Sequence, residues 1–360
     1  MDAALAAGRI PPTMQAAYLL EPGRVSLRTV PVPRIGPGEA LLRLKVCGLC
    51  ASDAIDWYVA QKAPFVFGHE PAGEIVKVGA GVAGFSPGDR VFVHHHAPCL
   101  NCRACQSGDV VHCSTWRRSA LDPGGLAEFI RIPAENLSAD TLRLPPDLSF
   151  EAGAMIEPVA CAVKALQRGA LASGLDVMIM GLGFMGQVLG YLCRGWEPGR
   201  RSQGQLLGAD RIAARLERAA SGWADGVIDI DQGAAADFAR AATGGRGVDL
   251  AIVTPPSQQA LHDAIRSTRS GGRVVLYAPT PPGEGVPVDL NGVFFREISL
   301  IPSYSAGPAE TRKAMHYVSE GIVPVDNLIT HRLPLKQIEK AYSLIKDAQR
   351  ALKVVVIVDV

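Results

Sequence analysis

A glycine-rich turn at residues 181–186 constrains the fold of this chain more than any other feature of its sequence. The run GLGFMG follows the apolar segment DVMIM, which has the length of a strand, and opens an apolar segment of helical length. In this context the pattern GxGxxG is typical of a strand–turn–helix unit that binds the pyrophosphate of a dinucleotide. The first glycine permits a tight turn, the second lets the pyrophosphate approach the backbone, and the third lets the helix pack closely on the strand. The residues predicted to contact the cofactor here are Gly181, Gly183, Phe184, Met185 and Gly186.

Strand-like and helix-like segments alternate around this turn. The strand-like segments are 177–180, around Leu206, near Val227, 248–253 and 273–277; the helix-like segments are 152–170, from Phe184 onward, 212–220 and 258–268. This alternation implies a parallel, doubly wound sheet. Residues 194–204 are polar and lack helical periodicity, so they are predicted to form a loop. Further along the chain we expect helices at 309–320 and 335–347 and a strand at 351–358.

The segment from residue 14 to about residue 155 has a different pattern. Its short apolar runs are 40–46, 73–78, 90–93 and 127–132, and the turn sequences GPGE, FSPGDR and DPGG separate them. Such a pattern is typical of an all-β barrel or sandwich. At roughly 150 residues per domain, the length of 360 residues also indicates two domains.

The charge and hydropathy of the chain argue against two classes of function. Lys and Arg number 36 against 35 Asp and Glu, so the basic excess of a nucleic-acid-binding protein is missing. No apolar run reaches the ~18 residues that span a bilayer, and the N-terminal segment MDAALAAGRIPPT lacks the basic region of a secretory signal. We therefore expect a cytoplasmic protein with no nucleic-acid partner and no membrane partner.

Half of the eight cysteines lie close together in one segment. Cys99, Cys102, Cys105 and Cys113 have the spacing C-x2-C-x2-C-x7-C. A reducing cytosol disfavours structural disulfides, whereas four thiolates at short spacing suit the tetrahedral coordination of zinc. An iron–sulfur cluster also uses four cysteines, but the spacing differs from that of ferredoxins. Because protein would fill all four coordination positions, we predict a structural zinc rather than a catalytic one.

A second set of metal-ligating residue types is scattered along the chain: Cys50, His69, Glu70 and Glu157. A thiolate, an imidazole and a carboxylate leave one coordination position open, as a catalytic zinc requires. Spacing alone leaves alternatives open, because the run GHE is compatible with a surface turn and Cys47-x2-Cys50 with half a zinc knuckle or a redox pair. A redox pair needs its thiolate at a helix start, and the preceding β pattern does not offer one.

An acidic residue about 20 positions after the glycine turn is expected to bind the adenosine ribose of the cofactor. Asp210, in the run QLLGADR, is the best match, and the loop at 194–204 accounts for its slightly greater distance along the chain. Its carboxylate would accept hydrogen bonds from both ribose hydroxyls and repel a 2′-phosphate, which favours NAD over NADP. The adjacent Arg211 leaves NADP open, and Asp210 is also compatible with a helix N-cap.

Five motifs, taken in order, resemble those of one enzyme family. They are VCGLCASD (46–53), GHEPAGEIVKVGAGVAGFSPGDRV (68–91), the four-cysteine segment, EPVACAVKAL (157–166) and GLGFMG (181–186). Together they resemble the zinc-dependent medium-chain alcohol dehydrogenases, most of all the sorbitol (polyol) and threonine dehydrogenase branch. The resemblance runs from about Met14 to the C-terminus. It implies an α/β fold in which a GroES-like β-barrel catalytic domain, residues 1–160 completed by 300–360, surrounds an inserted Rossmann domain at residues 161–299.

The resemblance also implies roles for individual residues. Cys50, His69 and Glu157 would hold the catalytic zinc, with Cys50 being the second cysteine of the CxxC. Glu70 would bind the zinc or its water as the ion moves during turnover. Cys47 occupies a variable position and is expected to pack in the interior. With the structural ion, this makes two Zn²⁺ per chain.

The proton relay is the part of the site where this sequence departs from the family pattern. Ser52 matches the hydroxyl that takes the proton from the substrate, but the His that usually follows three residues later is Ile55 here. Counting back from the four-cysteine segment, His95 falls where the family places a side chain in the substrate pocket, so it would contact substrate or replace the missing shuttle. In an alternating strand His94 and His96 would face the other side. A polar strand end, or extra metal affinity, is the alternative interpretation of these three histidines.

Motifs and resemblance together predict a zinc-dependent oxidoreductase that transfers a hydride between NAD(P) and a secondary alcohol. Glu157 and His95 favour a polar small-molecule substrate, such as a sugar alcohol, a cyclitol or an amino alcohol. One alternative is a simple alcohol or aldehyde dehydrogenase. Another is a non-catalytic, zinc-stabilised dinucleotide-binding sensor, which the departure at Ile55 motivates. The family implies a homodimer or homotetramer.

Overall fold

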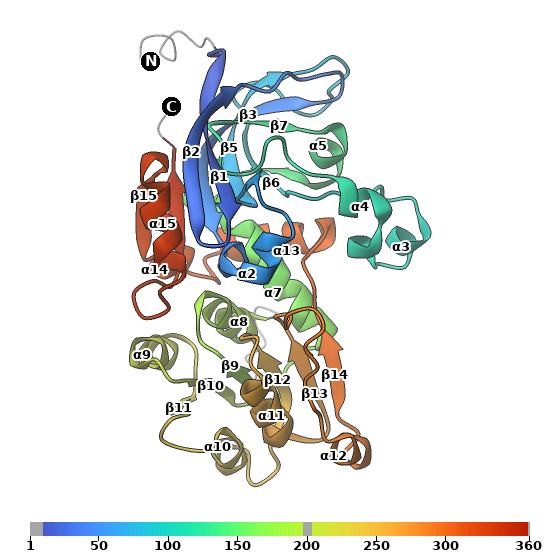
Figure 1. Cartoon of the computed structure of the whole chain (residues 1–360). Coiled ribbons are helices and arrows are strands. Elements are labelled where there is room, and N and C mark those ends of the chain that lie inside the picture. The colour runs from blue at the N-terminus through green and yellow to red at the C-terminus, as the bar shows by residue number, and fades with distance from the viewer. Residues whose placement is uncertain (1–9, 197–203, 359–360) are drawn as a thin grey trace. The chain divides into compact units, whose positions relative to one another are not determined.

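A computed structural model describes residues 10–196 and 204–358, which fall into two compact units (Figure 1). The first unit comprises residues 1–160, 306–321 and 325–360, and the second comprises residues 161–305 and 322–324. The second unit therefore interrupts the first in sequence. The chain returns to the first unit at residue 306, whereas the sequence-based estimate was residue 300.

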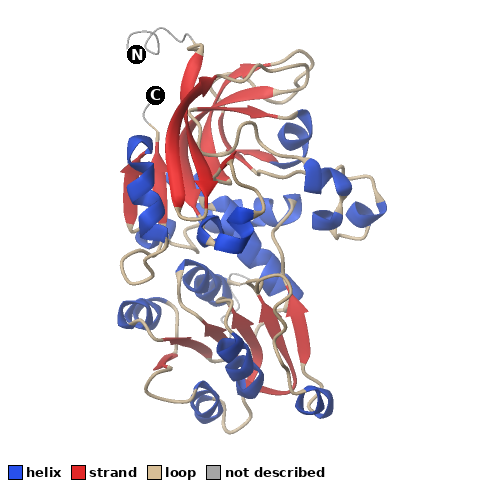
Figure 2. Cartoon of the chain, in the orientation of Figure 1, coloured by secondary structure: helices blue, strands red, loops and turns tan. Residues whose placement is uncertain are grey.

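The first unit is built on β-sheets, whose strands are red in Figure 2. One sheet has the strand order β2-β1-β4, and a larger one has the order β15-β16-β3-β5-β6-β8, with β7 paired to β3. The strands are β1 (Thr13–Glu21), β2 (Arg24–Pro31), β3 (Ala40–Leu49), β4 (Phe65–Val66), β5 (Glu70–Val78), β6 (Arg90–Val93), β7 (Phe129–Ile132), β8 (Thr141–Arg143), β15 (His331–Pro334) and β16 (Val354–Ile357). The apolar side chains of these strands form one core that includes Leu42, Ile75, Ile130 and Val356. Burying each such side chain contributes roughly 1.5–3 kcal/mol.

The register of three antiparallel strands determines which residues meet at one end of the larger sheet. Gly48 of β3 pairs with Glu70 of β5, and Leu49 of β3 pairs with Val354 of β16. The ends of β3, β5 and β16 therefore lie side by side although they are far apart in sequence.

Short helices and two longer ones complete the first unit. They are η1 (Ala51–Ala54), α2 (Asp56–Ala60), α3 (Arg103–Gln106), η2 (Val110–His112), α4 (Ser114–Arg118), α5 (Ala134–Asp140), α6 (Phe150–Ala154), α13 (Pro308–Ser319), α14 (Val325–Leu328), η3 (Leu335–Gln337) and α15 (Ile338–Ile345). Helix α7 (Ile156–Arg168) begins in the first unit and continues into the second. The single helix predicted over 152–170 is thus two helices, and α6 ends where Met155 N donates to Ala152 O (3.1 Å).

The second unit is a six-stranded, all-parallel sheet with the order β11-β10-β9-β12-β13-β14. Its strands are β9 (Val177–Met180), β10 (Leu206–Asp210), β11 (Gly226–Asp229), β12 (Val248–Val253), β13 (Thr268–Leu276) and β14 (Ser299–Pro302). Its helices are α8 (Phe184–Gly195), α9 (Ala213–Gly222), α10 (Ala235–Ala242), α11 (Gln258–Ser267) and α12 (Leu290–Phe295). Since α8 contacts α9 and α10 contacts α11, these four helices form two pairs on the sheet. The predicted doubly wound sheet is confirmed.

Three local features of the second unit differ from the sequence-based predictions. Helix α10 was not predicted, and β13 begins at Thr268 rather than at 273. The predicted loop at 194–204 begins too early, because α8 continues to Gly195. Residues 197–203 of that loop lie outside the described residues.

A search of the described residues for a helix both long and apolar enough to cross a membrane found none.

Candidate functional site

Cys50, His69 and Glu70 meet at the end of the larger sheet of the first unit. Their candidate ligand atoms all lie within 4.8 Å of one another. Cys50 follows β3 directly, His69 precedes β5, and Glu70 is the first residue of β5, so the pairing of these two strands brings the three together. A thiolate, an imidazole and a carboxylate at this spacing fit zinc with one open coordination position.

Asp53 orients the imidazole of this cluster. Its Oδ1 lies 3.4 Å from His69 Nδ1, and its Oδ2 accepts a hydrogen bond from Cys50 N at 3.1 Å. Burial disfavours the charged imidazole, but the Asp53 carboxylate and the Cys50 sulfur together outweigh it and raise the pKa of His69 well above its ordinary value. A carboxylate behind a ligating histidine fixes its ring and strengthens its bond to a metal. Asp53 stands in the motif that the sequence singled out, but this role was not predicted.

Lys353 supplies a buried positive charge to Glu70. Its Nζ donates to Glu70 Oε1 at 2.7 Å and to Leu49 O at 3.0 Å, and both charged side chains are buried. The Glu70 carboxylate raises the pKa of Lys353 against the opposing effect of burial. Lys353 precedes β16, so it reaches Glu70 only through the pairing of β16 with β3. Sequence reasoning missed this residue.

Gly48 leaves the space that the Glu70 carboxylate occupies. A Cβ added at residue 48 would lie 1.7 Å from Glu70 Oε2 and 2.8 Å from Met155 Cε. The glycine of the VCGLC motif is therefore a steric requirement of the cluster.

Glu157 lies in a neighbouring group with His94 and His95. The candidate ligand atoms of these three residues are also within 4.8 Å of one another. The two groups adjoin, because the rings of His69 and His95 are 5.1 Å apart between centroids. Desolvation lowers the pKa of His95 well below its ordinary value, so its imidazole is neutral at pH 7.

The expectation that His94 faces away from His95 is wrong. Strand β6 ends at Val93, so strand alternation does not extend to the histidines that follow. His94 and His95 consequently share one group. His96 is outside this group: its Nδ1 lies 2.6 Å from Ser119 O, and its ring lies between those of Trp116 and His95, with centroid distances of 4.2 and 4.4 Å.

Ser52 of the predicted proton relay, and Ile55 at the position of the missing histidine, are close in sequence to Cys50. Ser52 is in η1, between Cys50 and Asp53, and Ile55 ends that turn with its N–H donated to Ser52 O at 3.3 Å.

The four clustered cysteines form a separate lobe that fits a structural zinc. Their sulfurs lie within 4.8 Å of one another, with Sγ–Sγ distances of 3.6 Å for Cys102–Cys105 and for Cys99–Cys113. A tetrahedral site with Zn–S bonds of ~2.3 Å requires sulfurs about 3.8 Å apart. Backbone N–H groups of Asn101 and Cys102 lower the pKa of the Cys99 thiol, which favours the thiolate that zinc binds.

The glycine-rich turn of the second unit lies at the carboxyl end of β9, where the strand order reverses between β10 and β12. Ligands of doubly wound sheets bind at such switch points. Gly181 has φ of 87°, and a Cβ added at Gly186 would lie 2.0 Å from Gly181 O. The turn is therefore close to the helix that follows it. Helix α8 begins at Phe184. The backbone N–H groups of its first turn, which includes Phe184 and Met185, suit a phosphate.

Asp210 ends β10 beside this turn. Its Oδ2 accepts from Leu182 N at 2.6 Å, and its Oδ1 accepts from the N–H groups of Arg211 and Ile212. Helix α9 starts at Ala213, three residues after Asp210, and its N-cap is Ile212, so Asp210 does not cap it. Arg211 is exposed, and its guanidinium lies 3.7 Å from Asp231. Arg215, which was not predicted, has Nη1 3.7 Å from Asp210 Oδ2 and lies next to Gly183.

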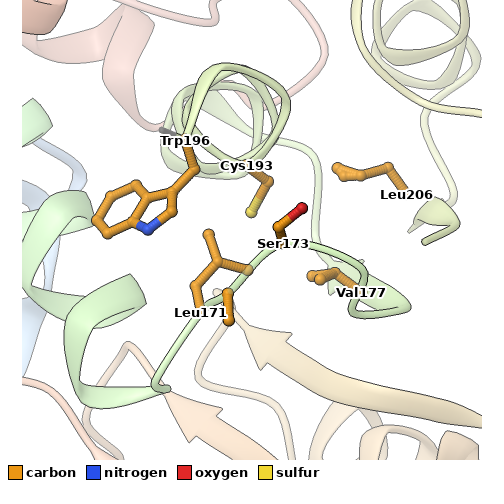
Figure 3. A pocket seen from close by; sticks show the side chains of 7 residues that line it. Leu171, Ser173, Val177, Cys193, Trp196 and Leu206 are labelled. Carbon is orange, nitrogen blue, oxygen red and sulfur yellow. The ribbon is translucent and has the colours of Figure 1, made fainter. Parts of the chain in front are cut away.

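A small pocket in the second unit is separate from this turn (Figure 3). It is lined by Leu171, Ala172, Ser173, Val177, Cys193, Trp196 and Leu206. Val177 and Leu206 begin their strands, so the pocket lies at the amino ends of β9 and β10, opposite to the glycine turn. Burial raises the pKa of Cys193 to about 12, which leaves an inert thiol.

Comparison with known proteins identifies the family. Residues 36–146 match the alcohol dehydrogenase GroES-like domain, and residues 204–320 match the zinc-binding dehydrogenase family. The sorbitol dehydrogenase of Bacillus subtilis (strain 168) is 30% identical over 341 residues, which cover 92% of this chain and 93% of the relative. The chain belongs to the zinc-dependent medium-chain alcohol dehydrogenases.

Further relatives agree with this assignment to the sorbitol and threonine branch of these dehydrogenases. The L-threonine 3-dehydrogenase of Bacillus licheniformis is 28% identical, covering 91% of this chain and 94% of the relative. A zinc-binding dehydrogenase of Sinorhizobium meliloti 1021, solved with NADP, has a TM-score of 0.83 at 26% identity and covers 96% of this chain and 99% of its own. An alcohol dehydrogenase of Escherichia coli CFT073, solved with NADH, has a TM-score of 0.85 at 26% identity, with coverages of 96% and 100%. The chain thus combines a GroES-like domain with a Rossmann domain, and the family uses zinc and NAD(P).

Proposed function

We propose that this dehydrogenase oxidises a secondary alcohol of a polar, multi-hydroxyl or amino-alcohol substrate, or reduces the corresponding ketone. The observation that carries the proposal is the cluster of Cys50, His69 and Glu70, whose ligand atoms lie within 4.8 Å of one another in a chain of this family. The similarity to sorbitol and threonine dehydrogenases supports a sugar alcohol, a cyclitol or an amino alcohol as the substrate class.

In this proposal Cys50, His69 and Glu70 hold the catalytic zinc together with Glu157, whose charge acts on Glu70. Cys99, Cys102, Cys105 and Cys113 hold the structural zinc. When bound, zinc lowers the pKa of a substrate hydroxyl and NAD(P) accepts the hydride. Asp53 keeps His69 oriented, and Lys353 compensates the charge of Glu70.

Ser52 takes the substrate proton in this proposal, and His95 passes it on. The position of His95 supports this role, because its ring centroid lies 5.1 Å from that of His69. An imidazole that is neutral at working pH can accept a proton, which the aliphatic Ile55 cannot do.

Gly181, Gly183, Phe184, Met185 and Gly186 bind the pyrophosphate of the cofactor, and Asp210 binds its adenosine ribose. We expect NAD to be preferred over NADP, because the Asp210 carboxylate would repel a 2′-phosphate. The Arg211 guanidinium lies 3.7 Å from the Asp231 carboxylate. Because Arg211 directly follows Asp210 in the chain, NADP stays open as the alternative cofactor.

The decisive experiment measures NADH formation across a panel of sugar alcohols, cyclitols, amino alcohols and simple alkanols. We expect the polyhydroxylated or amino alcohols to be oxidised with the highest kcat/KM, and Cys50→Ser or chelation to abolish the reaction. Cys161→Ser, which changes a thiol outside both clusters, is the matched control. Activity that survives both chelation and Cys50→Ser would rule out the zinc mechanism.

Two results of the same panel would favour the alternatives. A preference for simple alkanols would indicate a simple alcohol dehydrogenase. Tight NADH binding without turnover of any substrate would indicate a dinucleotide sensor.

We also propose that the protein is cytoplasmic and forms a homodimer or homotetramer. Strand β14 is at the edge of the parallel sheet, and the large apolar side chains Leu290, Phe294 and Phe295 of α12 are more than 70% exposed. An open strand edge with neighbouring apolar surface supports self-association.

A further inference from the structure

Gln187 is a buried amide that the function proposed above does not use. It directly follows Gly186, the last glycine of the turn, and it is fully buried in α8. Its Nε2 donates to Leu182 O at 3.1 Å and to Arg215 O at 3.0 Å. Its Oε1 accepts a hydrogen bond from Trp223 Nε1 at 2.9 Å. One side chain therefore ties the glycine-rich turn to α9 and to the residue that caps the end of α9.

Trp223 sets the orientation of the Gln187 amide. An indole N–H can only donate a hydrogen bond, so it selects the oxygen of the amide. The NH2 group then faces the two backbone carbonyls, which can only accept. Both N–H donors and the oxygen of the side chain are thus paired in the interior. A buried polar network in which every member is paired makes the segments that it joins more rigid.

The indole of Trp223 is held against α8 by a close fit. A Cβ added at Gly190 of α8 would lie 2.1 Å from Trp223 Cε2, so only a glycine leaves space for the ring. The indole is 2% exposed, and the backbone carbonyl of Trp223 accepts from Arg194 Nε at 3.0 Å. The packing therefore keeps the indole N–H next to Gln187.

The peptide groups at the start of the turn are fixed by this arrangement. Leu182 N donates to Asp210 Oδ2 at 2.6 Å, while Leu182 O accepts from the Gln187 side chain. The backbone N–H of Gln187 also donates to Gly183 O at 3.0 Å. Gln187 thus holds two successive carbonyls of the turn. A turn that already has its bound conformation loses less conformational freedom when a ligand binds, which raises the affinity.

We propose that Gln187 is a positioning residue for the dinucleotide: it holds the glycine-rich turn in the conformation that binds the pyrophosphate, and Trp223 holds Gln187 in place. The proposal rests on the function proposed above, in which this turn binds NAD(P). The same amide also holds the backbone of Arg215, whose guanidinium lies 3.7 Å from Asp210 Oδ2 beside the turn.

Calorimetric titration of NADH into the cofactor-free, full-length protein measures the effect of Gln187. We expect Gln187→Leu to raise the Kd about 10-fold, because a turn that is in the binding conformation for a tenth of the time binds a tenth as tightly. Trp223→Phe keeps an aromatic ring against Gly190 and removes only the N–H donor. It should raise the Kd about 3-fold, since one of the three hydrogen bonds is lost.

Thr243→Val is the matched control, because it removes another buried hydrogen-bonding side chain from the same unit. Thr243 Oγ1 donates to Ala239 O at 2.7 Å and accepts from Gly247 N at 2.9 Å. Thr243 precedes β12 and lies at the amino ends of the strands, opposite to the turn. We expect this variant to lose stability in urea titrations and to bind NADH like the wild type.

Hydrogen exchange of the cofactor-free protein reports on the turn without ligand or turnover. The amide of Leu182 should exchange about 10-fold faster in Gln187→Leu, because its peptide group has lost one of its two anchors. It should exchange like the wild type in Thr243→Val. With the alcohol that the substrate panel identifies, the KM for NAD should rise as the Kd does, while kcat stays within about twofold.

Three results would overturn the proposal. Wild-type Kd and wild-type exchange in Gln187→Leu and Trp223→Phe show that the turn keeps its conformation without this amide; if Gln187→Leu does not fold, Trp223→Phe decides by the same two measurements. An equal loss of NADH affinity in Thr243→Val shows that the effect is one of general stability. A wild type that binds no NADH contradicts the proposed function itself, and the inference about Gln187 fails with it.

Discussion

Gly48 controls the position of the Glu70 carboxylate through the absence of a side chain. The Cβ of Gly48→Ala would lie 1.7 Å from Glu70 Oε2, so the carboxylate must move away from the cluster. We expect zinc affinity at Cys50–His69–Glu70 to fall about 10–100-fold, as when a supporting contact of a metal ligand is lost. Titration with a competing chelator measures this affinity.

The control for this prediction is Gly285→Ala. No described atom lies within 4 Å of a Cβ added there, and the variant should bind zinc like the wild type. Equal zinc affinity in both variants would show that Glu70 does not need the space above Gly48.

Lys353 is a buried charge whose loss should cost folding stability. In Lys353→Met the Glu70 carboxylate keeps its burial but loses the ammonium group 2.7 Å away. Breaking a buried pair on one side costs about 3–5 kcal/mol, so the free energy of unfolding should fall by that amount in urea titrations of the metal-free protein.

Lys346→Met tests whether any lysine loss has this effect. Lys346 pairs with Asp56 at 3.6 Å on an exposed part of the surface, and such pairs contribute at most about 1 kcal/mol. A loss of similar size in both variants would contradict the role given to Lys353.

At the scale of elements, the four-cysteine lobe has a small core. Its buried residues are Val111, Cys113 and Trp116, packed against the remaining cysteines. So few apolar side chains cannot hold a loop in place, and we expect zinc to do so. Cys102→Ser should lower the zinc content by one ion per chain and expose Trp116, which acrylamide quenching of its fluorescence detects. Cys161→Ser should change neither, and a Cys102→Ser protein with full zinc content would refute a structural zinc here.

Elements with a strong hydrophobic pattern could be predicted from the sequence, whereas elements with a weak hydrophobic pattern could not. Strand β9 is apolar throughout, β12 is apolar except for Asp249, and both were predicted at their observed bounds. Helix α10 was missed because the side chains it buries are Ala235, Ala236 and Ala239, which are too small to make an obvious apolar stripe. The direction of the His94 side chain was predicted wrongly, because the prediction assumed an alternating strand and β6 ends at Val93, one residue before His94.

At the scale of the whole molecule, the sequence could indicate the metal-ligand types but not the residues that support them. Motifs local in sequence bring Cys50 and Asp53 together, whereas Lys353 and Glu70 are 283 residues apart. Asp140, whose Oδ2 lies 2.9 Å from His94 Nδ1, is 171 residues from Thr311, and the two meet only through the packing of α13 near α5. Such partners follow from strand register and helix packing, which no short motif encodes.

Self-association is the prediction that concerns the whole molecule. Replacing Phe294 and Phe295 together by serine removes two exposed apolar side chains next to the edge strand β14. We expect light scattering to find a dimer or tetramer for the wild type and a 38.0 kDa monomer for the variant. Leu100→Ser changes an exposed apolar residue of the cysteine lobe and should not alter the mass. An unchanged mass in the phenylalanine variant would exclude α12 from the interface.

The pairing of β16 with β3 has a consequence for the biosynthesis of the enzyme. Glu70 is translated early, yet its counter-charge is translated 283 residues later. A nascent chain that has not passed residue 353 lacks the counter-charge of the Glu70 carboxylate, however well its earlier strands have folded. Incomplete translation products therefore remain without the ion pair that stabilises the finished site, even with every predicted metal ligand present.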